Sequence, residues 1–148
     1  MNWIPLLRRL GRHALRLIPS EPLRTPAPKR ARPTPDGQLR LHLFSADFDG
    51  PEEAHRFCFI APGADLPVDL TRELTGAFID TDEVEMIHGD IPTRLIEFLS
   101  EQEADDIVLR MAGDNTLILI TEHAFGGLPY ELDDTDRLTY LGPQLVAV

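Results

Sequence analysis

The sequence has little cysteine and no long apolar run. Its 148 residues include one cysteine, which excludes an internal disulfide framework and a cysteine-rich zinc site. No apolar stretch approaches the roughly 20 residues that are needed to cross a bilayer. Hydrophobic residues make up 43% of the chain, which is enough for a core, and this length is typical of one domain.

Basic residues are scarce outside the first quarter of the chain. Residues 1–36 contain eight Arg or Lys and two acids, whereas residues 37–148 contain six Arg and 23 acids. The two parts therefore carry +6 and −17 within a net charge of −11. A body so acidic repels nucleic-acid phosphates, which argues against direct binding of DNA or RNA, and it favours basic partners.

Two sequence patterns occur in the basic part. In residues 1–18, apolar side chains recur at helical spacing (Trp3, Leu7, Leu10, Ala14 and Leu17), with arginines on another face. This pattern predicts either a basic amphipathic helix that contacts an anionic membrane surface or a poorly ordered tail. Residues 19–37 hold six of the 13 prolines and predict a disordered linker. Arginines interrupt the apolar positions, so a secretory signal is not expected and the predicted location is the cytoplasm.

The acidic part, residues 38–148, predicts an α+β fold, with a mostly antiparallel sheet of about four strands and three to four short helices. TLILIT (116–121) is typical of a central strand covered on both faces. The segments 116–123 and 137–146 predict an antiparallel hairpin with a long connection. The alternation over 39–48 indicates a half-buried strand. The remaining expected elements are helices at 51–60, from 68 to about 76, from 92 and at 104–111 (with a strand as the alternative), an edge-like strand at 83–88, and a last strand or strand pair at 137–148.

The acidic part lacks the residue spacings of known metal-binding and catalytic motifs. The runs that begin at Asp80 and Asp133 lack the residues that a calcium-binding EF-hand loop needs at its fifth and sixth positions. The histidines show no HExxH spacing and the serines no G-x-S-x-G setting. His42 and His123 are interpreted as structural and Cys58 as core filler. We therefore expect neither an enzyme nor a site for a metal or cofactor.

Three acidic clusters remain, and each borders a predicted strand end. They are the loop Asp47-Phe48-Asp49, the run Asp80–Glu85 with Asp90, and the loop Glu131–Asp136. One such cluster is explained by solubility. Three of them on one domain favour a docking surface for a basic protein, because opposite charges speed encounter.

Residues 39–146 resemble the bacterial immunity protein 22 family of polymorphic toxin systems. The resemblance rests on the segments LHLFSADFDGPEEAHRF, FIDTDEVEM, FLSEQEADDIV, DNTLILITEHAF and RLTYLGPQLVAV. It implies a non-enzymatic α+β immunity protein that binds one cognate toxin, often a nuclease, and blocks it. The alternative is a small acidic interaction or regulatory module that residues 1–18 tether to a membrane surface.

An immunity protein of this kind would offer carboxylates to arginines and lysines of the toxin. The predicted carboxylate contacts are Asp47, Asp49, Asp80, Asp82, Glu83 and Glu85. Phe48 and Phe78 are predicted to be apolar anchors among them.

Overall fold

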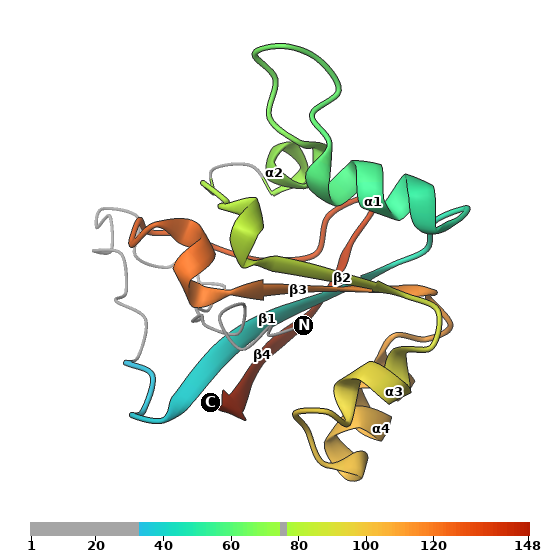
Figure 1. The fold of residues 1–148 in the computed structure, drawn as a ribbon, viewed down its shortest axis with the longest axis vertical. Helices are drawn as coiled ribbons and strands as arrows, with labels where there is room; N and C mark the ends of the chain where they lie inside the picture. Colours follow the sequence, from blue (N-terminus) through green and yellow to red (C-terminus); the bar gives the residue numbers. More distant parts are fainter. Residues whose placement is uncertain (1–32, 75–76) are drawn as a thin grey trace, which may run out of the picture.

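A computed structural model describes residues 33–74 and 77–148 of the chain. The helix or tail expected at residues 1–18, and most of the expected linker, lie outside the described residues. The described part has the predicted α+β architecture (Figure 1). Its elements, with η denoting a 3₁₀ helix, are β1 (Gln38–Ala46), α1 (Pro51–Phe59), α2 (Asp69–Glu73), η2 (Thr81–Glu83), β2 (Val84–His88), α3 (Ile91–Leu95), α4 (Glu101–Arg110), β3 (Thr116–Thr121), η3 (Glu122–Phe125) and β4 (Thr139–Ala147).

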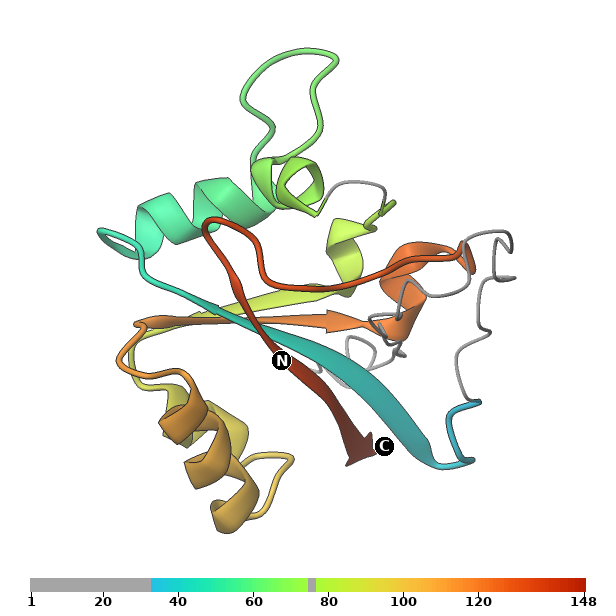
Figure 2. The same ribbon diagram turned by 180° about the vertical axis from the view of Figure 1, so that it is seen from behind.

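The four strands form one antiparallel sheet in the order β2-β3-β1-β4. The predicted hairpin between 116–123 and 137–146 is therefore wrong, because β1 lies between β3 and β4. Residues 126–138 instead carry the chain across one face of the sheet to the outer side of β1 (Figure 2). Leu132 and Leu138 of this crossing segment are buried, and their burial favours this path over a solvated hairpin loop.

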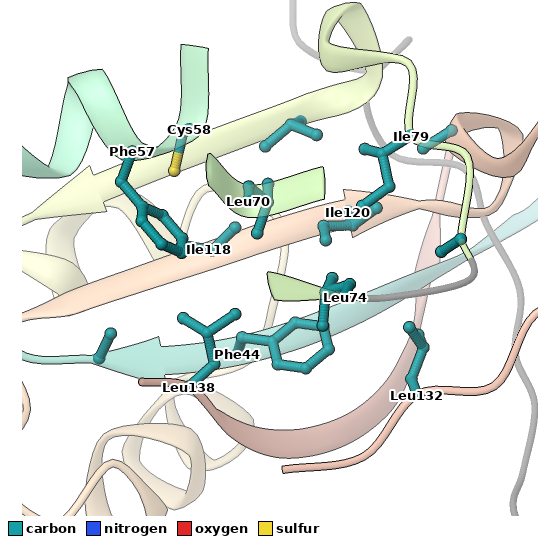
Figure 3. Packing of buried hydrophobic residues seen from close by; sticks show 14 of the residues in the cluster. Phe44, Phe57, Cys58, Leu70, Leu74, Ile79, Ile118, Ile120, Leu132 and Leu138 are labelled. Carbon is teal, nitrogen blue, oxygen red and sulfur yellow. The ribbon is translucent and has the colours of Figure 1, made fainter. Parts of the chain in front are cut away.

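Each face of the sheet packs against its own core. Leu39, Leu41 and Leu43 of β1 lie in the core under α3 and α4. Phe44 and Ala46 lie in the opposite core. Figure 3 shows Phe44 there beside Leu74 of the α2 end and Leu138 of the crossing segment. The sequence interpretation of β1 as half-buried is corrected by this arrangement, since both faces of its second half are covered. β3 is buried along its whole length, as predicted for a central strand.

α1 and α4 begin where local signals place them. Pro51 occupies the first turn of α1, followed by Glu52 and Glu53, and carboxylates there complement the helix dipole. Ser100 and Glu103 form a complete capping box at the start of α4, which satisfies two orphan amides. The helical interpretation of 104–111 is thereby confirmed over the strand alternative.

Two helices are shorter than the sequence patterns predict. α2 ends at Glu73, and the backbone of Leu74 leaves helical geometry while its side chain enters the core. α3 ends at Leu95, although the helix expected from residue 92 has an apolar stripe of Leu95, Phe98 and Leu99. Among the described residues, no helix has the combined length and apolar character required for crossing a membrane.

Candidate functional site: an acidic groove

A groove of about 410 Å³ lies at the end of the sheet where β1 stops and β3 begins. We call it the acidic groove. Three aspartates from three separate segments line it, namely Asp47, Asp114 and Asp136. Its remaining lining residues are Ala46, Thr135, Arg137, Leu138 and Thr139.

The carboxylates are positioned by neighbouring structure. Asp47 directly follows the last residue of β1 and is exposed. Asp114 Oδ2 accepts a hydrogen bond of 2.8 Å from the hydroxyl of Ser45, which is buried. The Asn115 side chain accepts from the amide of Phe48 at 3.0 Å and donates to its carbonyl at 2.7 Å. These bonds tie the segment after β1 to the turn before β3, so both rims of the groove are held together.

Arg137 lines the groove, but its guanidinium is engaged elsewhere. Nη2 donates to Glu53 Oε1 at 3.3 Å. The guanidinium carbon also lies 4.6 Å from the ring centre of Phe57 and 5.3 Å from that of Phe48, which are distances of cation–π attraction. The described residues offer no ion-pair partner to Asp47 or Asp136. The groove is therefore an electronegative recess with carboxylates open to an external cation.

The predicted contact residues do not form one surface, and strand register shows why. Ala46 at the end of β1 pairs with Thr116, whereas Val84 at the start of β2 pairs with Ile120. The acidic segments beside these two strand ends thus lie at opposite ends of the sheet (Figure 1). Asp47 and Asp49 belong to the groove end, and Phe78, Asp80, Asp82 and Glu83 belong to the other end.

Two of the predicted contact residues are buried in this structure. Phe48 is 3% exposed and packs on Phe57 at a ring-centre distance of 5.2 Å. Glu85 is 9% exposed, and its two oxygens accept from Arg94 Nε and Nη2 at 2.7 and 2.9 Å. Neither side chain is presented to a partner, because each already has its contacts inside the protein.

The other predicted residues are exposed at what we call the η2–η3 corner. Phe78 is 56% exposed, and Asp80 and Asp82 are also on the surface. Glu83 is half-buried and accepts a hydrogen bond of 2.7 Å from the Thr121 hydroxyl. The corner consists of Phe78, Asp80, Asp82, Glu83, Glu122 and Leu128, which lie on η2, on η3 and beside them.

Asp114 and Asp136 were not among the predicted contacts. Asp136 closes the third acidic cluster of the sequence, whereas Asp114 is a single acid in a turn. No sequence pattern signals their convergence on Asp47. The convergence arises from the pairing of β1 with β3 and from the crossing segment before β4.

The histidine and cysteine outside the groove have structural surroundings. His42 is fully buried, with Nδ1 2.8 Å from the hydroxyl of Tyr140 and Nε2 3.0 Å from that of Tyr130. Burial raises the pKa of the Cys58 thiol to about 12, which makes it a poor nucleophile at neutral pH. His123 lies on η3 and is exposed, not in a strand. In residues 33–74 and 77–148, no three His, Cys, Asp or Glu side chains are placed to hold a metal ion together.

What the groove offers chemically is a set of carboxylates that can accept hydrogen bonds. Carboxylates in a recess form charge-assisted hydrogen bonds with an ammonium or guanidinium group, and these are stronger than neutral hydrogen bonds. Comparison of the chain with family models, with curated proteins and with solved structures gave no match.

Proposed function

We propose that this chain is a non-enzymatic immunity protein that binds a basic bacterial toxin and neutralises it. The observation that carries the proposal is the acidic groove, which three aspartates from separate segments line and whose one lining cation is turned toward Glu53 and two aromatic rings. The proposal keeps the expectation from the sequence that residues 39–146 resemble the bacterial immunity protein 22 family.

A lysine or arginine side chain of the toxin is the ligand that the groove suits. Its cationic head would meet the carboxylates of Asp47, Asp114 or Asp136, which line the groove. Ser45 already donates to Asp114, so this carboxylate is held in place before the partner arrives. Preorganisation of this kind lowers the entropy cost of association.

The acidity around the groove suits such a partner at longer range as well. The described residues contain six arginines against 24 acids. A surface of this charge attracts a basic protein over a Debye length of about 10 Å at 0.1 M salt. Association is therefore expected to be fast at low ionic strength and slower as salt is added.

The direct test is to look for a toxin-like gene beside this one and to co-express its toxic domain with this chain. Cells that carry both proteins are expected to grow, and cells that carry the toxic domain alone are expected to die. Equal killing with and without this chain would contradict the proposal.

Charge reversal then tests the groove itself. Asp47→Lys and Asp136→Lys are each expected to lower the association rate with the toxic domain at least about tenfold at low salt, because each reverses a charge that steers encounter. Asp105→Lys is the matched control, since Asp105 is exposed on α4. Stopped-flow fluorescence measures the rates. An equal effect of all three substitutions would remove the groove from the interface.

A further inference from the structure

The η2–η3 corner exposes an apolar surface that the acidic groove does not use. Phe78 and Leu128 are both 56% exposed. Phe78 lies over Gly126, where an added Cβ would approach the ring to 3.4 Å. The amide of Asp80 donates to the carbonyl of Ala124 at 2.7 Å, which fixes the segment that bears Phe78 against η3. Large exposed aromatics on a fixed support are typical of contact surfaces.

Carboxylates stand next to this apolar surface. Asp80 caps η2, with Oδ1 accepting from the amide of Asp82 at 3.0 Å, so its second oxygen remains available. The carboxylate of Asp82 has no ion pair within the described part of the chain. The corner therefore combines an aromatic ring with negative charge, which suits a segment that is both apolar and basic.

The residue that directly follows such a segment of this same chain is attached at the corner. The hydroxyl of Thr34 contacts both carboxylate oxygens of Glu122, at 3.0 and 2.9 Å. Immediately before it the sequence reads PAPKRARP (26–33), in which Lys29, Arg30 and Arg32 alternate with proline and alanine. Arg32 is two residues from Thr34 and Lys29 is five, so even an extended chain keeps Lys29 within roughly 17 Å of Thr34.

The acidic groove lies farther away from this attachment point. Thr121, directly before Glu122, pairs with Leu41, whereas the groove end begins where Thr116 pairs with Ala46. Five strand residues separate these two positions, which corresponds to about 17 Å along β3. The described end of the basic segment, Thr34, is thus attached at the corner and not at the groove.

We propose that the η2–η3 corner is the docking site of the chain's own basic segment, residues 26–32. Lys29, Arg30 and Arg32 meet the carboxylates of Asp80, Asp82 and Glu83, and the prolines cover Phe78. A short tether gives the segment an effective concentration on the order of millimolar, so contacts that would be weak between separate molecules suffice within one chain.

The consequence is competition at this corner. A basic protein that approaches Phe78 must first displace residues 26–32, whereas the acidic groove stays open. This inference goes beyond the proposed function, because it requires no toxin and holds whatever the groove binds.

Lys29 makes a sharp experiment possible, because it is the single lysine of the chain. Carbodiimide treatment of the full-length protein joins the lysine amine to any carboxylate that it touches, and peptide mass spectrometry identifies the acid. At low salt we expect the main products to join Lys29 to Asp80, Asp82 or Glu83. Equal linkage to Asp47, Asp49 or Asp136 would overturn the proposal.

Matched variants test whether residues 26–32 bind the corner or are merely held near it by their link to Thr34. Asp80→Asn with Asp82→Asn is expected to reduce the Lys29 linkage at the corner, including that to Glu83, at least about fivefold, and asparagine still caps η2. Asp47→Asn with Asp49→Asn is the control at the other end of the sheet and should change nothing. Arg30→Ser with Arg32→Ser, or 0.5 M salt, should also reduce the yield about fivefold. A yield that is insensitive to both would show mere proximity and contradict docking.

The occupant must also come from the same molecule. A mixture of unlabelled and ¹⁵N-labelled full-length chains reports this, because a link between molecules carries mixed isotopes. We expect links within one chain at micromolar concentration. Predominantly mixed products would identify a second copy as the occupant and overturn the inference.

Discussion

At the scale of residues, the buried polar side chain of His42 is satisfied by hydrogen bonds within the core. Both tyrosines of the chain meet one ring, that of His42, through hydroxyl contacts of 2.8 and 3.0 Å. A neutral imidazole has one donor and one acceptor nitrogen, so the two hydroxyls match its needs. The interpretation of His42 as structural agrees with this burial and bonding.

Cys58 gives the first prediction at this scale. The pKa of its thiol is raised by burial from 9.0 to about 12, so at pH 8 the native protein holds about a thousandfold less thiolate than the unfolded chain. Reaction with a thiol reagent such as DTNB should therefore be very slow in the native protein and fast in denaturant. Equally fast labelling in both conditions would contradict the burial.

The same pKa also gives the direction of an alkaline effect on stability. The native pKa lies above the unfolded one, so the protonated thiol contributes its full stabilisation of the folded state below pH 9. As the pH rises toward 12, the free energy of unfolding falls by about 1.4 kcal/mol per pH unit. Urea titrations of the wild type and of Cys58→Ala between pH 9 and 11 should diverge by this slope.

At the scale of elements, short helices depend on tertiary partners. α3 has five residues, too few for an isolated helix to be stable. Arg94 ties it to β2 through its two bonds to Glu85, where the side chains are 15% and 9% exposed. α3 also buries Ile91 and Leu95 against the sheet. Its position is therefore set by neighbours and not by helix propensity.

Arg94→Ala tests this dependence. It leaves a buried carboxylate on Glu85 without its cation, which costs about 3 kcal/mol of the free energy of unfolding. Arg72→Ala is the control, because the Arg72–Asp69 pair is largely exposed and contributes less than about 0.5 kcal/mol. Guanidinium denaturation compares the two variants, and equal losses would contradict a structural role of the Glu85–Arg94 pair.

At the scale of the whole molecule, the central feature is a sheet with a core on each face. β1 and β3 are the inner strands, β2 and β4 the edges. The acids before β2 and after β1 are thereby placed at opposite ends of the sheet. We call these the corner end and the groove end. Each end offers a distinct surface, and the two proposals above use one surface each.

Amide hydrogen exchange tests the strand order. Inner strands open only with global unfolding, whereas edge strands open at lower free energy. We expect the slowest exchange in β1 and β3, and measurably faster exchange in β2 and β4. Slow exchange in β4 together with fast exchange in β1 would favour the hairpin order that the sequence suggests.

Local patterns identify most of the elements, because their signals lie within a few residues. The sequence shows three such signals: the alternation of apolar residues in β1, the continuous apolar run of β3 and the capping box of α4. They suffice for the α+β class. They do not determine strand order, because residues 126–138 are long enough either to form a hairpin loop or to cross the sheet.

The residues of the candidate site could be predicted only in part from the sequence, for the same reason. The sequence alone determined that a basic segment precedes a strongly acidic domain and that Asp47, Asp80 and Asp82 border strand ends. Only the tertiary structure decided that Asp47 joins Asp114 and Asp136 in one groove, and that Phe48 and Glu85 are buried. The physical reason is that local signals act over a few residues, whereas a groove depends on strand register and on which apolar faces pack together, and these are set by burial over the whole chain.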